Sequence, residues 1–249
     1  GSSVTVNGGY IEVLDDAIFL EASTADLRNV VLNATDVDLY LIDGSSWFFR
    51  AYYAVRGLAN SKGFPTNAIY GFTTILASFL KEFKPRRVGM IFDAKGPTFR
   101  NEIYREYKAH RPPMADDLVL QIPHIKSLPK LYGIATFEIG GVEADDVIGT
   151  VAERMKHQGY ECVIVSRDKD MMQLVEPGVL MYDDSKRLRI DGDEVSKIMG
   201  VGPEKIVDLL ALVGDASDNV PGVNGIGPKT AVDLLNGVDS LEDLYNNLG

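Results

Sequence analysis

Asp38-Leu-Tyr-Leu-Ile-Asp43 is an apolar run with the length of a β-strand, and it ends in a carboxylate. Similar apolar runs follow at residues 88–93, 134–138 and 161–166. Helical patterns stand between them, at 69–83 after Thr66 as a candidate cap, and from about 143 to Gly159 as a candidate left-handed C-cap. This alternation predicts an α/β fold: a largely parallel central sheet with helices on both faces.

The composition is that of an ordinary globular protein, with 45% hydrophobic and 24% charged residues in a chain of 249. No apolar run approaches the roughly 18 residues that a membrane span needs, so we expect no membrane partner. Cys162 is the one cysteine, which excludes an internal disulfide and favours a reducing compartment.

The net charge of −11 argues at first against a polyanionic partner. Residues 1–37 hold six acids and one basic residue, however, so residues 38–249 carry −6, and nine acids of that part stand in short motifs. An acidic, metal-filled site on a mildly basic body is therefore compatible with the composition. Residues 1–37 form an extension of unknown role, in which Asn7-Gly8-Gly9 predicts a hairpin turn and Ser23 with Asp26 a short helix.

Carboxylates follow three of the predicted strands and begin the helix near residue 143, and a further pair lies in Gly214-Asp-Ala-Ser-Asp-Asn219. Because the carboxyl ends of parallel strands share one edge of the sheet, we expect the acids to converge there. A single acid in such a place is more often a helix cap or a solvated residue, but a converging set of like charges needs neutralisation. The candidate metal ligands are Asp43, Asp93, Glu143, Asp145, Asp146, Asp168, Asp170, Asp215 and Asp218.

Hard oxygen ligands without paired histidines or cysteines favour Mg²⁺ or Mn²⁺, and many carboxylates with few other catalysts suggest two ions and phosphoryl chemistry. The chain has neither a Gly-x-Ser-x-Gly elbow nor a Walker phosphate loop. Basic and aromatic residues interleave over 99–113, and a helix there would place most of Arg100, Tyr104, Tyr107, Lys108 and Arg111 along one broad face. We expect Lys108 and Arg111 to bind the scissile phosphate and Tyr107 to stack on a base; a solvated helix with ordinary ion pairs is the alternative.

Pro221-Gly-Val-Asn-Gly-Ile-Gly-Pro-Lys-Thr-Ala231 lies between helical patterns at 204–213 and 228–235, which is typical of a helix-hairpin-helix. Its glycines would let the backbone approach a DNA phosphate, and the following helix start would present amides and a lysine. A plain interhelical turn is the alternative. With Arg100, the candidate DNA-binding residues are Gly222, Gly225, Gly227, Lys229 and Thr230.

From about Asp38 onward the chain resembles the 5′ nuclease (5′-3′ exonuclease) domain of bacterial DNA polymerase I, in the flap endonuclease superfamily. The motifs that carry the resemblance are Ile42-Asp-Gly-Ser-Ser46, Phe92-Asp-Ala-Lys-Gly96, Tyr107-Lys-Ala-His-Arg-Pro-Pro113, Gly141-Val-Glu-Ala-Asp-Asp146, Asp168-Lys-Asp170, Gly214-Asp-Ala-Ser-Asp-Asn219 and the hairpin. All nine carboxylates match the family's acidic set.

The resemblance implies a PIN-like nuclease core at 38–200 with a helical arch near 98–120 that carries Tyr107, Lys108 and Arg111, then a truncated helix-hairpin-helix subdomain at 201–249. It also implies K⁺ held by hairpin carbonyls, DNA with a 5′ flap, nick or branched junction as substrate, a DNA polymerase partner in cis or in trans, and a bacterial cytoplasmic, nucleoid-associated location.

We therefore expect a metal-dependent 5′-3′ exonuclease and flap endonuclease of replication and repair. Two alternatives remain at this point: a branched-DNA-binding protein with little or no turnover, and a small-molecule metal phosphohydrolase. The second leaves the hairpin and the basic aromatic segment unexplained.

Overall fold

The computed structural model describes residues 4–7, 10–13 and 39–246. Contacts divide the chain into two compact units, which are described separately. The first comprises Gly1–Thr98 and Pro113–Val165, and the second comprises Phe99–Pro112 and Ser166–Gly249. This division does not follow the predicted boundary at residue 200, because the basic aromatic segment and the residues after 165 group with the C-terminal helices.

Four parallel strands form the centre of the first unit: β3 (Leu39–Asp43), β4 (Val88–Asp93), β5 (Ala135–Ile139) and β6 (Cys162–Val165). They lie in the order β5-β4-β3-β6. Strands β3 and β6 are buried along their whole length, as expected for a parallel sheet that is covered on both faces. The four predicted strands and the largely parallel sheet are confirmed.

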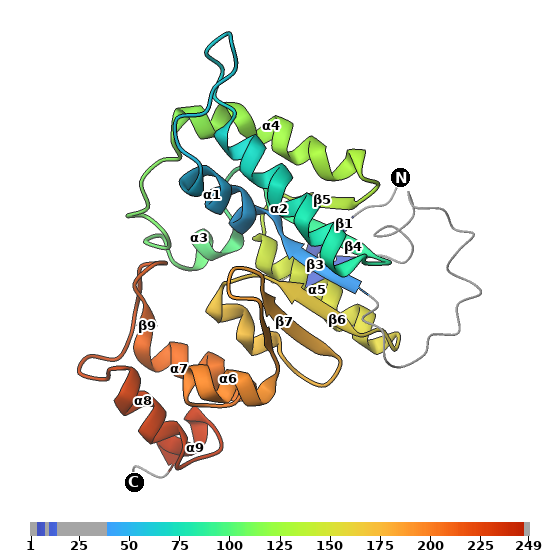
Figure 1. Ribbon diagram of the computed structural model, residues 1–249. Helices are drawn as coiled ribbons and strands as arrows, with labels where there is room; N and C mark the ends of the chain where they lie inside the picture. The colour runs from blue at the N-terminus through green and yellow to red at the C-terminus, as the bar shows by residue number, and fades with distance from the viewer. Residues whose placement is uncertain (1–3, 8–9, 14–38, 247–249) are drawn as a thin grey trace. The chain divides into compact units, whose positions relative to one another are not determined.

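Three helices lie beside one another in this unit, α1 (Gly44–Ala54), α2 (Asn67–Phe83) and α4 (Asp116–Leu131) (Figure 1). Aromatic rings of α2 pack against one face of the sheet. The Phe72 ring centroid lies 6.2 Å from that of Phe92 in β4, and Phe79 packs edge-on against Tyr40 of β3 at 5.3 Å. Such edge and offset ring pairs stabilise a core beyond the area that they bury.

The opposite face carries α5 (Ala144–His157). Side chains alternate along a strand, so Leu39 points away from the face of Tyr40, and Leu39 is paired with Cys162 of β6. The Cys162 Sγ lies 3.9 Å from the carbonyl oxygen of Ala152 in α5. Helices therefore cover both faces as predicted, and Gly159 ends α5 in a left-handed conformation with φ +84°.

Helix α1 begins directly after β3 and was not predicted. Asp43 is its N-cap: the Oδ1 atom accepts a hydrogen bond of 2.8 Å from the Ser46 amide. Trp47 and Ala51, one helical turn apart, are buried on its inner face. The carboxylate that we expected only at a strand end also starts a helix.

The N-terminus of α2 is capped from another helix. Thr66 occupies the predicted N-cap position, but its side chain makes no capping bond. Instead the Oε1 atom of Gln121, a fully buried residue of α4, accepts from the amides of Ala68 (2.9 Å) and Ile69 (3.2 Å). The Gln121 Nε2 atom donates to Asn67 Oδ1 at 2.9 Å. One buried amide therefore ties α4 to the start of α2.

The second unit contains short elements: α3 (Phe99–Ile103), a 3₁₀ helix (Lys169–Leu174), the antiparallel pair β7 (Val179–Asp183) and β8 (Leu188–Ile190), α6 (Gly192–Met199), α7 (Ile206–Val213), the antiparallel pair β9 (Gly214–Asp215) and β10 (Val220–Pro221), α8 (Pro228–Leu235) and α9 (Leu241–Asn246). Helices α7 and α8 confirm the two helical patterns on either side of the hairpin, although residues 203–205 form a 3₁₀ turn before α7.

The single helix expected over the basic aromatic segment is wrong. Helix α3 ends at Ile103, and residues 104–111 form turns. Lys108 has φ +55°, a left-handed conformation that a right-handed helix does not admit. Arg100, Tyr107 and Arg111 consequently do not share one helical face.

At the N-terminal end, β1 (Val4–Asn7) pairs antiparallel with β2 (Tyr10–Val13), and Asn7 lies opposite Tyr10. This pairing agrees with the predicted hairpin, whose turn residues Gly8 and Gly9 lie outside the described residues. The helix predicted near Ser23 and Asp26 lies outside the described residues. Within the described parts of the chain, every helix is too short or too polar to cross a membrane.

Replacing Gln121 by leucine should lower the free energy of unfolding by about 2–4 kcal/mol, since one buried and one partly buried amide lose their acceptor at about 1–3 kcal/mol for each unsatisfied group. Urea unfolding followed by circular dichroism measures this. Gln158→Leu is the matched control: Gln158 is exposed, and we expect a change within about 0.5 kcal/mol. Equal unfolding free energies for both variants would refute the capping role of Gln121.

Candidate active site

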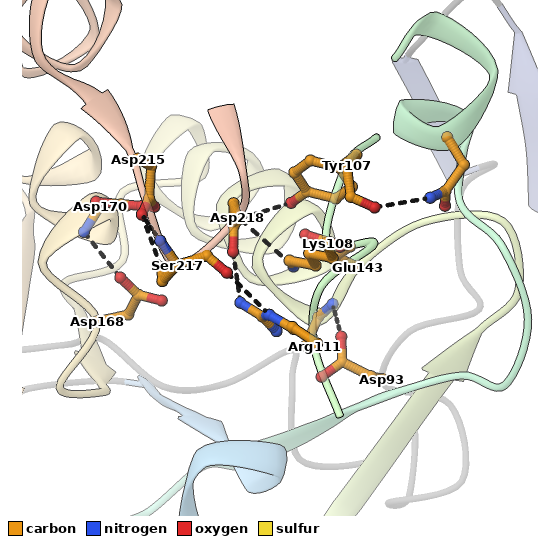
Figure 2. A network of polar contacts seen from close by, with 12 residues as sticks. Asp93, Tyr107, Lys108, Arg111, Glu143, Asp168, Asp170, Asp215, Ser217 and Asp218 are labelled. Carbon is orange, nitrogen blue, oxygen red and sulfur yellow. Dashed lines mark hydrogen bonds and ion pairs between the residues drawn. The ribbon is translucent and has the colours of Figure 1, made fainter. Parts of the chain in front are cut away.

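The first set of acids lies at the carboxyl ends of β3 and β4 and at the start of α5, all within the first unit. Asp43 and Asp93 end neighbouring strands, and Asp43 is 7% exposed. The Asp93 amide donates to Ser45 Oγ at 2.9 Å. The Asp93 Oδ1 atom accepts from the Ala144 amide at 2.8 Å (Figure 2). The end of β4 is thus bonded both to the start of α1 and to the start of α5.

The first turn of α5 brings three more of the predicted acids. Glu143 is the N-cap, and its amide donates to Asp146 Oδ2 at 2.9 Å. Glu143, Asp145 and Asp146 are all partly buried. Since acids near a helix N-terminus are favoured by the helix dipole, this turn can hold several carboxylates in place before any cation binds.

The second set of acids lies in the second unit. The Asp170 amide donates to Asp168 Oδ1 at 2.9 Å at the start of the 3₁₀ helix. Asp215 Oδ1 accepts from both the amide and the hydroxyl of Ser217, each at 2.7 Å (Figure 2). Burial opposes ionisation of Asp215, but the Ser217 hydrogen bonds outweigh it and keep the pKa of Asp215 below its usual value.

Asp170 is the acid of this set whose ionised form is least favoured by its surroundings. Burial, followed by the charges of Asp168 and Asp215, raises the pKa of Asp170 to about 7. Its Oδ1 atom is buried and has no hydrogen-bond partner among the residues that the structure describes. A buried, unpartnered oxygen beside two acids is the chemical setting that fits a divalent cation, because the cation would replace a proton and satisfy the oxygen.

Asp218 faces the basic aromatic segment of the same unit (Figure 2). Its Oδ2 atom accepts from the Tyr107 hydroxyl at 2.8 Å and lies 3.6 Å from Lys108 Nζ. Its Oδ1 atom pairs with the Arg111 guanidinium. Tyr107 is only 9% exposed, so its ring is not available to a base in this arrangement.

Four of the predicted hairpin residues are exposed around the start of α8. Gly225 has φ +84°, and a Cβ on Gly225 or Gly227 would meet no atom within 4 Å. Gly227 is the N-cap of α8, and Lys229 and Thr230 lie exposed in its first turn. The backbone here is open to a phosphate.

Gly222 and Arg100 have different surroundings. A Cβ on Gly222 would overlap the carbonyl of Val213, and one on Gly214 would overlap the Gly222 nitrogen, so the two chain segments cross where only glycine fits. The Arg100 guanidinium stacks on the Phe99 ring, with 4.7 Å between its Cζ atom and the ring centroid.

Sequence reasoning missed three supporting residues, Ser45, Ser217 and Asn219. Ser45 and Ser217 hold Asp93 and Asp215 as described above, and Asn219 Nδ2 donates to the Glu106 carbonyl at 2.8 Å. Each adjoins or follows a predicted acid closely in the sequence, which was the available signal. Among the described residues, the structure gathers no group of three or more His, Cys, Asp or Glu side chains in metal-binding geometry.

Two sequence families match the chain. Residues 38–200 match the family described as the 5'-3' exonuclease N-terminal resolvase-like domain, and residues 192–249 match its C-terminal SAM fold.

Individual relatives agree with the families. A 5'-3' exonuclease of Aquifex aeolicus is 47% identical over 74% of this chain and 63% of its own length. DNA polymerase I of Pseudomonas aeruginosa is 46% identical over 84% of this chain. The chain thus spans less than two thirds of the Aquifex protein and 23% of the Pseudomonas polymerase.

A solved structure has the same fold. The bacteriophage T5 flap endonuclease, crystallised as a pseudo-enzyme-product complex with DNA and metal ions, superposes with a TM-score of 0.68 at 26% identity, over 84% of this chain and 78% of its own. Both family matches, the Aquifex relative and this fold lead to one assignment: the chain belongs to the 5'-3' exonuclease family.

Proposed function

We propose that the chain is a structure-specific 5′ nuclease that hydrolyses phosphodiester bonds of DNA at 5′ flaps, nicks and branched junctions. The observation that carries the proposal is the bonded edge of the first unit, where Asp93 links the ends of β3 and β4 to the acidic first turn of α5. The relatives support the activity, because they include a 5'-3' exonuclease and a flap endonuclease crystallised with DNA and metal ions.

The first set of acids, Asp43, Asp93, Glu143, Asp145 and Asp146, would hold the catalytic ion or ions. Asp168, Asp170, Asp215 and Asp218 would form a second, more open site. An all-oxygen donor set favours Mg²⁺ or Mn²⁺. A divalent ion in such a site supplies positive charge that acidifies water and stabilises the charge developing on the phosphate.

The remaining predicted residues would handle the nucleic acid. Lys108 and Arg111 would bind the scissile phosphate, and Tyr107, once its ring leaves its buried position, would stack on a base. Gly225 and Gly227 with Lys229 and Thr230 would hold the duplex backbone, assisted by K⁺ on hairpin carbonyls. Arg100 would add a phosphate contact beside Phe99, and Gly222 would keep the hairpin in shape.

A DNA polymerase, in cis or in trans, is the partner that we propose, supported by the similarity to DNA polymerase I of Pseudomonas aeruginosa. Replication and repair of bacterial DNA in the cytoplasm, at the nucleoid, is the corresponding setting.

Asp146→Asn should lower Mg²⁺-dependent cleavage of a labelled 5′-flap duplex by at least about 100-fold, since a charged metal ligand is lost. The fold should survive, because the amide oxygen can still accept from the Glu143 N–H. Asp233→Asn, on the exposed side of α8, is the matched control and should cleave normally. Flap binding without cleavage by the unsubstituted chain would instead favour the branched-DNA-binding alternative.

Asp170→Asn should stabilise the protein in EDTA, and the gain should grow with pH. The folded pKa of about 7 lies above 3.8, the ordinary pKa of an aspartate, so the ionised carboxyl destabilises the fold progressively between about pH 4 and pH 7 and fully above pH 7. We expect a melting temperature at least about 2 °C higher at pH 8, the effect of about 1 kcal/mol in a chain of this size, and a smaller difference at pH 5.

Divalent cations should shrink or reverse this difference, because only the aspartate can bind the ion with full charge. Melting curves with Mg²⁺ or Mn²⁺ test this. A stability gain that is the same at pH 5 and pH 8 would show that the Asp170 charge is not the cause.

Lys229→Ala should weaken binding of a non-cleaved duplex in EDTA and reduce the slope of log affinity against log salt by about 1, the value for one lost phosphate contact. Fluorescence anisotropy at several KCl concentrations measures both. Lys197→Ala is the control, because the Lys197 ammonium pairs with Glu194 at 2.9 Å on α6. An unchanged salt slope for Lys229→Ala would remove that lysine from the DNA interface.

A further inference from the structure

The carboxylate of Asp218 holds three side chains that the proposed function needs elsewhere. We call residues 104–111 the basic segment and residues 215–219 the acidic loop. Tyr107 and Lys108 contact one oxygen of Asp218, at 2.8 and 3.6 Å, and Arg111 pairs with the other. The Asp218 side chain is 18% exposed and that of Lys108 25%, so these ion pairs are partly screened from water.

Backbone contacts complete the attachment of the basic segment to the acidic loop. The Lys108 amide donates to the Asp218 carbonyl at 2.9 Å, and Arg111 Nε donates to the Ser217 carbonyl at 3.2 Å. On the other side, Asn219 Nδ2 donates to the Glu106 carbonyl at 2.8 Å. These bonds account for the turns and for the left-handed Lys108 where a helix was expected.

The acidic loop is the rigid partner of the two. Strands β9 and β10 close its ends, and Gly214 and Gly222 cross so closely that a Cβ on either would overlap the backbone of the other segment. The Val223 amide also donates to the Leu212 carbonyl at 2.8 Å. The basic segment has only five residues of α3 before it and two prolines after it. If the contact opens, the basic segment is therefore the part that moves.

We propose that Asp218 is an exchangeable anchor: it holds the basic segment until a divalent cation binds its carboxylate, and the cation then releases Lys108 and Arg111 to the substrate. The physical cause is competition of cations for one carboxylate. A doubly charged ion at Asp218 attracts the oxygens more strongly than an ammonium or a guanidinium does, and it repels both of them. The inference rests on the proposed function, in which Asp218 is a metal ligand and the two basic residues bind phosphate.

When the cation displaces them from Asp218, the basic side chains pass from one anionic partner, a carboxylate, to another, a phosphate. Before metal binding, Lys108 and Arg111 neutralise a carboxylate; afterwards they are available to a phosphate, which guanidinium groups bind in a similar two-oxygen geometry. Release would also uncover the Tyr107 ring, which must leave its buried position before it can stack on a base. Metal loading and substrate handling would thus be linked through one side chain.

Hydrogen–deuterium exchange of the full chain, in EDTA and in Mg²⁺ at matched ionic strength, tests the anchor. We expect peptides of the basic segment to exchange about tenfold faster in Mg²⁺, because the Lys108 amide loses the Asp218 carbonyl. Peptides of the acidic loop should exchange more slowly in Mg²⁺, because the ion holds them. Opposite shifts in two segments that are bonded to each other would not arise from general stabilisation.

Three variants sharpen the test. Asp218→Asn removes both ion pairs, so the basic segment should exchange fast already in EDTA and respond little to Mg²⁺. Arg111→Gln removes one of the two pairs, so its basic segment should exchange faster in EDTA than that of the unsubstituted chain and show a smaller Mg²⁺ response. Asn219→Gly removes one uncharged contact at a left-handed residue, φ +61°, and should keep the full Mg²⁺ response. Asp146→Asn should keep this response too, although we expect it to lose cleavage.

Equal exchange rates of the basic segment in EDTA and in Mg²⁺ would overturn the proposal. It would also be overturned if the basic segment of Asp218→Asn exchanged as it does in the unsubstituted chain. Should Asp218→Asn fail to fold, the Mg²⁺ titration of the unsubstituted chain and Arg111→Gln decide alone. Cleavage assays separate this inference from the proposed function: flap cleavage without release of the segment removes the anchor only, whereas release without cleavage removes the nuclease.

Discussion

A carboxylate that lies among other carboxylates needs a proton, a hydrogen-bond donor or a cation, and this constraint organises both acid sets of the protein. Backbone amides serve Asp43 and Asp93, at the starts of α1 and α5. Ser217 serves Asp215 with two donors, and Asp218 takes the cationic side chains of the basic segment. Asp170 has the least compensation, and its pKa of about 7 is the result. Each acid of the site thus has its own means of compensating the negative charge of its carboxylate.

These means of compensation also explain why the site and the fold cannot be separated. The amide that compensates Asp93 belongs to the first turn of α5, so neutralising one acid fixes the position of the helix that carries three others. The loop with Asp215 and Asp218 depends likewise on the crossing of Gly214 and Gly222, where no side chain fits. Substitutions at such supporting positions would change the spacing of the acids without replacing any acid. Sequence motifs that contain only the acids would not reveal this dependence.

The sequence predicted the parts of this structure that follow from local periodicity. Four apolar runs became parallel strands because such runs can be buried on both faces, and the helix starting near residue 143 ends at His157, just before the left-handed Gly159. The sequence did not predict local conformations that depend on residues far away in the chain. Gln121 caps α2 from a helix some fifty residues away, and the contacts of Lys108 with Asp218 replace the helix expected beyond Ile103. Asp43 and Asp93 could be proposed together as candidate ligands because strand ends converge in a parallel sheet, whereas the supporting serine and asparagine residues have no spacing rule of their own.

The two interpretations first weighed for each acid, a helix cap or a metal ligand, are compatible at Asp43 and Asp168. Each of these caps a helix with one oxygen, Oδ1. A cap uses one lone pair of a group that has about four acceptor sites, so it orients the carboxylate without exhausting it. Orientation by the backbone is also the least costly way to keep like charges close together, because the donors are already fixed by the helix and lose little entropy. Capping at Asp43 and Asp168 is therefore compatible with the proposed metal binding, and a capping bond at such a residue is no argument against that role.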